Sequence, residues 1–332
     1  MKKSLLALAV LGAFAGVASA QSSVTLFGVV DLNARYVKND GVARRVSLSQ
    51  DGINSSRLGF RGTEDLGGGL SARFWLEGGV NADTGTVSAT KFFGRRSTVS
   101  LVGGFGEVRL GRDYTPTFWN NTIYDAFGTN GLGDSSGVGQ LLSATTFVRA
   151  DNSIGYFLPA GIGGLFGQVM VAAGEGNPAG KYVGGRLGYG AGPFEVAAAY
   201  AQQDTASGDK QKTMNVGGSF DFGVAKVMGY YDRDTLASAK DNRYSISGVV
   251  PMGQGEIHAG YERSKLDTGV ATNTISKFAV GYVYNLSKRT AVYGTAARLS
   301  NGSLSTASIG SAPAPTAGGK STGAEFGVRH IF

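Results

Sequence analysis

Most of the chain after residue 20 alternates between apolar and small or polar side chains with a period of two. In residues 24–36 the even positions carry Val24, Leu26 and Val30, whereas the later odd positions carry Asp31 and Arg35. The alternation recurs, between clusters of Gly, Asp, Asn and Ser, in residues 194–201, 214–221, 244–250, 256–262, 277–284 and 325–332. A period of two bounded by turn residues predicts antiparallel β-strands joined by tight turns.

The second face of these strands is small or polar, and aromatic residues bracket the apolar face near the strand ends. The apolar faces of a soluble β-sandwich pack on each other, which gives aromatic residues no reason to gather at the ends. In a membrane barrel, aromatic residues lie at the water–lipid boundaries and the second face lines an aqueous lumen. Because lipid offers no hydrogen bonds, such a sheet must close on itself. We therefore predict an all-β fold, a transmembrane antiparallel β-barrel.

The length of the chain sets the size of this barrel. A tilted spanning strand takes about 9–11 residues, so residues 21–332 with their turns and loops supply about sixteen strands, a number that leaves an aqueous channel. No change in composition marks a second domain, and we expect one barrel domain over residues 21–332. The 54 glycines suit a curved sheet with tight turns.

The first twenty residues have the pattern of an export signal. Lys2 and Lys3 precede an apolar core over residues 4–17, and residues 18–20 supply the small side chains of a cleavage site. The core is short and no stop-transfer pattern follows, so we expect residues 1–20 to be cleaved, leaving Gln21 first, rather than to form a membrane anchor.

Composition and charge exclude several classes of function. The chain has no cysteine, which excludes disulfide scaffolds and thiolate metal sites. Its net charge of +7 is not gathered into a basic block, so we expect no nucleic-acid partner. The two histidines, His258 and His330, are far apart in sequence, and no calcium-loop spacing is present. We therefore expect no metal, no cofactor and no catalytic residues.

Several arginines fall on the polar faces of predicted strands. Leu58 and Phe60 share one face of their strand, which places Arg57 and Arg61 on the other. One interpretation is that each arginine lies at the rim, where it snorkels or pairs with acidic loops. An arginine facing lipid at mid-membrane costs about 2–4 kcal/mol, so the parity favours the lumen. A cluster of arginines there would suit a constriction that needs a positive field, with acidic groups opposite to balance it.

The segment 113–134 lacks sustained alternation and contains Pro116, Trp119, Tyr124 and Asp125. An ordinary external loop is one interpretation. A loop that folds into the lumen and narrows it would also explain these aromatic residues and the adjacent acids.

Motifs spread over residues 21–332 resemble those of general-diffusion porins of Gram-negative outer membranes, specifically the beta-proteobacterial group. These motifs are SVTLFGVVD at 23–31, SRLGFRGTEDLGGGL at 56–70, RRSTVSL at 95–101, FGEVRLGR at 105–112, RADNSI at 149–154, YVYNLSKRT at 282–290 and RHIF at 329–332. The resemblance implies a homotrimer of sixteen-stranded barrels in the outer membrane, each with its own pore constricted by the third external loop.

The chain looks most similar to the anion-selective members of that family, in which an arginine cluster faces loop acids. By motif match, Arg57, Arg95 and Arg149 would form the cluster, and Glu77 and Asp125 would be the balancing carboxylates. The terminal residue, Phe332, is similar to the aromatic residue that the barrel-assembly machinery recognises.

The sequence therefore predicts a passive diffusion channel for small hydrophilic solutes and ions, with a preference for anions. Three alternatives stay open at this point. One is a substrate-specific channel with a saturable binding site, and another is an outer-membrane β-barrel enzyme that uses His258 in a Ser-His-Asp set. The third is an exported β adhesin, which would be soluble without detergent.

Overall fold

The computed structural model describes residues 23–87, 90–141, 147–310 and 312–332, and the predicted export signal at residues 1–20 lies outside them. The described residues form one antiparallel sheet with two short helices, α2 (Pro116–Ile123) and η1 (Ser135–Val138). The strands are β1 (Ser23–Asn39), β2 (Arg45–Gln50), β3 (Arg57–Gly67), β4 (Leu70–Asn81), β5 (Thr86–Val87), β6 (Arg96–Gly103), β7 (Gly106–Tyr114), β8 (Arg149–Phe157), β9 (Leu165–Ala172), β10 (Tyr182–Ala191), β11 (Phe194–Asp204), β12 (Lys210–Asp221), β13 (Lys226–Leu236), β14 (Ala239–Met252), β15 (Gly255–Asp267), β16 (Thr272–Asn285), β17 (Thr290–Asn301) and β18 (Lys320–Ile331). Neither helix in this part of the chain is long and apolar enough to cross a membrane.

The sheet closes on itself through its first and last strands. β1 pairs with β18 from Val29 to Asn39, and its other edge pairs with β3 and then with β2. In the same way β4 pairs with β6 and, farther along, with the short β5. Since β2 and β3 pair with the same edge of β1, they count as one strand of the ring, and so do β5 and β6 beside β4. The closed ring therefore has sixteen strands, which confirms the predicted barrel.

The two faces of each strand differ in exposure as the alternation predicted. On β1, Asp31, Asn33 and Arg35 are buried on the inner side, while Val30 and Tyr36 are exposed on the outer side. The outer surface therefore carries the apolar residues that lipid requires, and the inner surface carries the polar ones.

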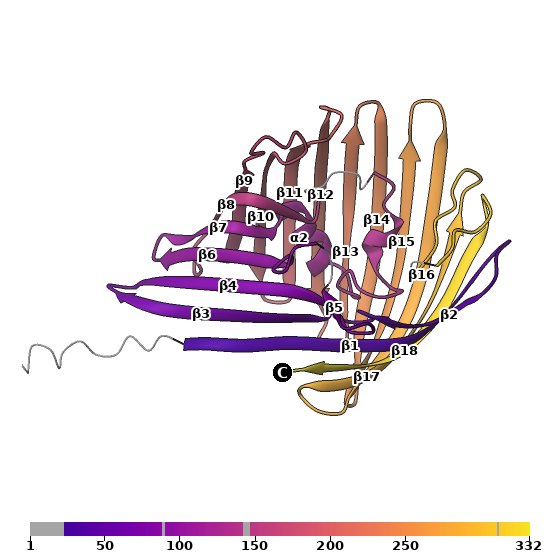
Figure 1. Cartoon of the computed structure of the whole chain (residues 1–332), viewed down its shortest axis with the longest axis horizontal. Coiled ribbons are helices and arrows are strands. Elements are labelled where there is room, and N and C mark those ends of the chain that lie inside the picture. Colours follow the sequence, from indigo (N-terminus) through magenta and orange to yellow (C-terminus); the bar gives the residue numbers. More distant parts are fainter. Residues whose placement is uncertain (1–22, 88–89, 142–146, 311) are drawn as a thin grey trace, which may run out of the picture.

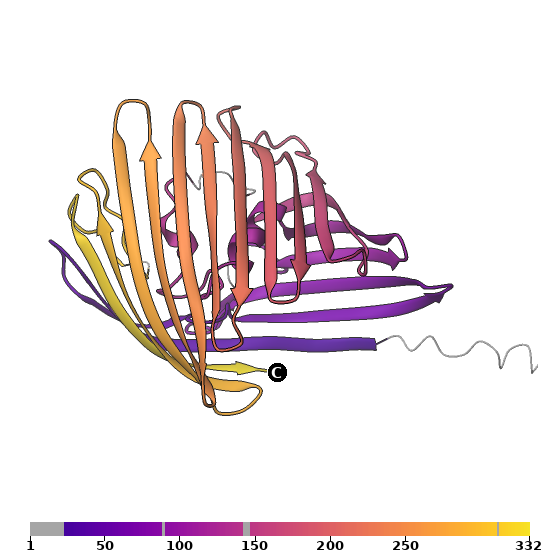
Figure 2. The same ribbon diagram turned by 180° about the vertical axis from the view of Figure 1, so that it is seen from behind.

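The strands are strongly tilted, as closure of a barrel requires. In Figure 1, β1, β3 and β4 run across the picture while β12 to β16 run steeply upward, and Figure 2 shows the same crossing from behind. Short turns such as the one between β3 and β4 join the strands at one end, where the C-terminus also lies beside β1. Since short turns are periplasmic in such barrels, the longer connections at the opposite end face the cell exterior.

The connection between β7 and β8 folds into the barrel, as the second interpretation of segment 113–134 proposed. We call its described residues, 115–141 and 147–148, the constriction loop. Thr115 caps α2, since its side chain accepts a hydrogen bond from the Phe118 N–H, and Pro116 occupies the first turn, where its missing N–H costs nothing. The helix packs against the inner faces of β10, β11 and β12, and both ribbon views place it inside the ring of strands (Figures 1 and 2).

Candidate functional site: the lumen constriction

The constriction loop is hydrogen-bonded to the far wall of the barrel. Asn120 donates to the Ala197 carbonyl on β11 (3.2 Å), and Asn121 donates to the Asp232 carboxylate on β13 (3.0 Å). Farther along, the Leu132 N–H donates to Glu325 on β18 (3.1 Å). The loop thus fills one side of the lumen and leaves the passage on the side of β3, β4 and β6 to β8. A cavity of about 800 Å³ occupies this passage between the loop and that wall.

Three arginines on the free wall converge on two residues. Arg57 lies at the start of β3, Arg95 just before β6 and Arg149 at the start of β8. The Glu77 Oε1 atom is 2.6 Å from Arg95 Nε and 3.4 Å from Arg57 Nη1. The Tyr114 hydroxyl accepts from Arg95 Nη2 (3.0 Å) and from Arg149 Nη2 (2.6 Å). The structure therefore brings together Arg57, Arg95, Arg149 and Glu77.

Neutral groups fix the geometry of this cluster. The Trp75 indole donates to Glu77 Oε2 (2.9 Å), and the Ser55 carbonyl accepts from Arg57 Nε (2.8 Å). The Arg149 guanidinium lies 4.3 Å from the centre of the Tyr114 ring, which itself stacks on Phe118 of α2. The Tyr114–Phe118 contact connects the arginines to the constriction loop.

The cluster carries more positive than negative charge. Glu77, which is only 6% exposed, pairs with Arg57 and Arg95, whereas Arg149 bonds to the neutral Tyr114 hydroxyl, so three guanidinium groups face one carboxylate. Like charges at this range repel each other by about 1–4 kcal/mol per close pair, depending on the local dielectric. The arrangement retains this repulsion and so concentrates positive charge at the narrow part of the lumen.

Asp125 lies elsewhere. Its carboxylate accepts hydrogen bonds from the backbone N–H groups of Phe127 (3.0 Å), Thr129 (2.9 Å) and Ser135 (3.2 Å). Burial raises the pKa of Asp125 above its ordinary value, although these three N–H groups oppose the shift. Of the two carboxylates expected beside the arginines, the structure thus pairs Glu77 with them and holds Asp125 within the constriction loop.

A profile of Gram-negative porins matches residues 7–304 of the chain. The chain belongs to the Gram-negative porin family. This porin is 42% identical to outer membrane porin protein 32 of Delftia acidovorans, with the full length of both covered. It is 28% identical to the major outer membrane protein P.IB of Neisseria gonorrhoeae, over 91% of this chain and 94% of that protein.

Solved structures include one relative and one further match in fold. The barrel matches the anion-selective porin from Comamonas acidovorans with a TM-score of 0.85 and 39% identity, covering 94% of this chain and all of that one. OmpT of Vibrio cholerae shares the fold with a TM-score of 0.70 at 16% identity, over 94% of this chain and 99% of that one. The resemblance seen in the motifs is confirmed. The protein is an outer-membrane porin, a passive diffusion channel and not an enzyme.

The one histidine considered for catalysis has a structural contact in this porin. His258 Nδ1 is 2.6 Å from the Ala126 carbonyl of the constriction loop, and its Nε2 is 3.0 Å from Glu256. In the described part of the chain, no group of three or more histidine and acidic residues is placed to hold a metal ion.

Two contributors to the constriction were not predicted from the sequence. Tyr114 was missed because its role comes from two arginines that are 19 and 35 positions away. Arg186 of β10, whose guanidinium donates to the Asn120 side chain and lies 4.6 Å from the Phe166 ring centre, was also missed. Parity along β10 was a usable signal for Arg186, since Leu187 and Tyr189 face outward on alternate positions.

Proposed function

We propose that this porin prefers anions and that Arg57, Arg95 and Arg149 set the preference. The observation that supports the assignment is their convergence on Glu77 and the Tyr114 hydroxyl, where one carboxylate against three guanidinium groups leaves an excess of positive charge beside the constriction loop. The related porin from Comamonas acidovorans is described as anion-selective, and at 39% identity it supports the same preference here.

The mechanism is diffusion in water through a fixed field. A small anion loses part of its hydration at the constriction and gains charge-assisted hydrogen bonds from guanidinium edges, whereas a cation meets only repulsion. Glu77 neutralises part of the positive charge and so limits the depth of the attraction, which lets an anion leave as readily as it enters. Such a channel shows a linear dependence of flux on concentration for monovalent ions.

The direct test is the variant Arg57→Gln/Arg95→Gln/Arg149→Gln in planar bilayers under a potassium chloride gradient. Loss of three charges should move the reversal potential towards the cation side and lower the chloride-to-potassium permeability ratio by about tenfold or more. The wild-type preference should weaken as ionic strength rises, because the Debye length falls from about 10 Å at 0.1 M to about 3 Å at 1 M.

A control variant with the same change in net charge separates the constriction from the whole protein. Lys212, Arg263 and Arg298 lie on the outer face of β12, β15 and β17 and are exposed. Replacing these three with glutamine should leave the reversal potential near the wild-type value. An equal shift in both variants, or no shift in either, would show that the constriction arginines do not set the preference.

We also propose that the working form is a homotrimer. The outer face of β3, β6 and β7 presents the exposed apolar residues Leu58, Phe60, Val99, Leu101 and Leu110, which suits a contact between subunits. Conductance steps that arrive in groups of three, together with a native-gel mobility of three chains, would support this assembly. Single steps from a species of one chain would exclude it.

We also propose that residues 1–20 are an export signal that is cleaved from the chain. N-terminal sequencing of the protein from outer membranes should give Gln21 as the first residue. A first residue within 1–20 would contradict the proposed cleavage site.

A further inference from the structure

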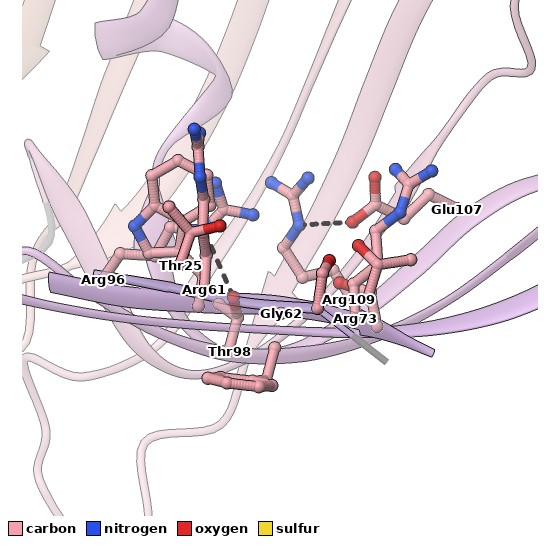
Figure 3. Close-up of a pocket in the computed structure, with 13 residues that line it drawn as sticks. Thr25, Arg61, Gly62, Arg73, Arg96, Thr98, Glu107 and Arg109 are labelled. Carbon is pink, nitrogen blue, oxygen red and sulfur yellow. Dashed lines mark hydrogen bonds and ion pairs between the residues drawn. The ribbon is translucent and has the colours of Figure 1, made fainter. Parts of the chain in front are cut away.

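A second group of arginines lies between the constriction and the periplasmic turns. It surrounds a pocket of about 350 Å³ on the inner face of β1, β3, β4, β6 and β7 (Figure 3). The arginines of this pocket are Arg61, Arg73, Arg96 and Arg109. Arg61 follows Arg57 by four positions on β3, which puts the two about 13 Å apart along the strand. The pocket adjoins the constriction cavity: Trp75, Arg96 and Arg109 line both, whereas Arg61 and Arg73 line the pocket and not the constriction cavity.

Strand register brings these side chains together. Arg61 pairs with Trp75, and Arg73 lies one inward position farther along β4. Ser100 of β6 pairs with Arg73 on one side and with Arg109 of β7 on the other. Directly paired and diagonal neighbours on one face of a sheet are about 5–8 Å apart, so the four guanidinium groups can reach a common space. Figure 3 shows Arg61, Arg73 and Arg109 extending from the wall on the same side.

Two of these arginines have acidic partners. Arg109 is 2.8 Å from Glu107 and 2.5 Å from Asp113, and Arg96 is 3.7 Å from Asp113. Within residues 23–87, 90–141, 147–310 and 312–332, no carboxylate lies within 4.0 Å of Arg61 or Arg73, and both are exposed to the lumen. Four guanidinium groups against two carboxylates leave an excess of about two positive charges.

Aromatic rings hold the guanidinium groups in place. Arg61 lies 5.3 Å from the Phe27 ring centre and 5.1 Å from that of Trp75. Arg96 lies 4.6 Å from the Trp75 ring centre. Stacking of a guanidinium on a ring leaves its N–H edges free to bind an oxyanion. The pocket also contains the hydroxyl groups of Thr25, Thr98 and Ser100, which are neutral hydrogen-bond donors.

We propose that this pocket binds a doubly charged inorganic oxyanion, of the size and charge of sulfate or hydrogen phosphate. The net excess of two charges matches a dianion, and guanidinium forks bind paired oxygens better than a spherical halide. The proposal deepens the anion preference proposed above and rests on that channel function.

The first test measures conductance in potassium chloride while sulfate replaces chloride at constant ionic strength. Wild-type conductance should fall saturably at low sulfate, and Arg61→Gln/Arg73→Gln should raise the half-saturating sulfate concentration by about tenfold or more. Arg61→Lys/Arg73→Lys, which keeps the charge and loses the fork, should give an intermediate value. The matched control is Arg263→Gln/Arg298→Gln, which should behave as wild type.

The outcomes separate this proposal from the one before it. A sulfate effect unchanged in Arg61→Gln/Arg73→Gln, or lost only in the variant of Arg57, Arg95 and Arg149, would overturn the pocket. A failure of the proposed anion preference appears instead in the potassium chloride gradient, where no sulfate is present.

A second readout uses Trp75, which contacts both Arg61 and Arg96. The chain has two tryptophans, so Trp119→Phe leaves Trp75 as the one fluorophore of its kind. Sulfate should change the Trp75 emission saturably, with the half-saturation seen in conductance, while chloride at equal ionic strength should not. The Arg61→Gln/Arg73→Gln protein should lose this change, and an emission that is insensitive to sulfate in the parent would overturn the proposal.

Discussion

Glu77 shows how one side chain determines the charge of the constriction. It is the shared partner of Arg57 and Arg95, and its second oxygen is held by the Trp75 indole. The residue therefore does two things. It neutralises part of the cluster, and it holds two long, flexible side chains in one place against their mutual repulsion.

Replacing Glu77 with glutamine should make the anion preference stronger, whereas loss of an arginine should make it weaker. One unit charge at about 4 Å in water is worth about 1 kcal/mol, so the permeability ratio should rise by up to about fivefold. The measurement is the reversal potential in a potassium chloride gradient. Glu64→Gln, at an exposed position near the β3–β4 turn, is the control, and a shift of Glu77→Gln towards cations would contradict the role given to Glu77.

At the scale of the element, buried polar contacts hold the constriction loop together with a hydrophobic cluster in which Phe127, Leu132 and Val138 pack against the barrel wall. Arg243 of β14 is buried between Asp232 (2.6 Å) and Asp234 (2.8 Å) of β13. Asp232 in turn accepts from Asn121 of the loop (3.0 Å). Breaking a buried pair of this kind leaves an uncompensated charge, so the network holds the loop to one wall.

Asp125 acts within the same loop and gives a prediction with a definite dependence on pH. Burial raises the pKa of Asp125, so the folded protein binds this proton more tightly than the unfolded chain does. Its contribution to the free energy of unfolding should therefore rise as the pH falls through the raised pKa, and level off below the unfolded value of about 3.9. Relative to Asp125→Asn, which removes the titration, wild-type stability should increase as the pH is lowered across this window. Urea unfolding in detergent at a series of pH values checks the sign, and a difference that is independent of pH would contradict it.

The same variant tests where the Asp125 charge acts. Three backbone N–H groups surround this carboxylate, so we expect Asp125→Asn to leave the reversal potential close to wild type. A shift as large as that of Glu77→Gln would instead support the balancing role that the motif match assigns to Asp125.

At the scale of the whole molecule, the fold depends on closure between its first and last strands. β1 and β18 pair over eleven residues, and Phe332 continues the ladder through two backbone hydrogen bonds with Gly28 (3.0 and 3.1 Å). The Phe332 ring covers Gly28, where a larger side chain would clash with it. Phe332 therefore has a packing role in addition to the assembly signal predicted from its position.

The variant Phe332→Ala separates these two roles. If the barrel-assembly machinery recognises Phe332, the amount of folded porin in outer membranes should fall severalfold, while refolding of the purified chain in detergent should proceed nearly as in wild type. Heat-modified gel mobility measures the folded fraction in both cases. Phe326→Ala, which removes an outward aromatic residue from the same strand, is the control. Equal losses in cells and in detergent would favour packing alone.

Much of the site could be predicted from the sequence because strand parity is a strict rule. A residue on a β-strand faces either lipid or lumen, so the positions of Leu58 and Phe60 alone place Arg57 and Arg61 inside. Loops have no such rule. Asp125 lies in one, and whether its carboxylate faces the arginines or accepts loop N–H groups depends on backbone torsions that no periodicity encodes.

The sequence by itself determined the barrel, its approximate number of strands and the inward direction of its arginines. These follow from a period of two, from chain length and from the need of a membrane-spanning sheet to satisfy its own hydrogen bonds. Tertiary structure alone decided that Tyr114 joins Arg95 to Arg149 and that the loop attaches to β11, β13 and β18. It also decided that Arg61 and Arg73 share a pocket with Arg96 and Arg109. Each of these is a contact between residues far apart in the chain, fixed by the register and curvature of the closed sheet, and a local pattern carries no information about such distances.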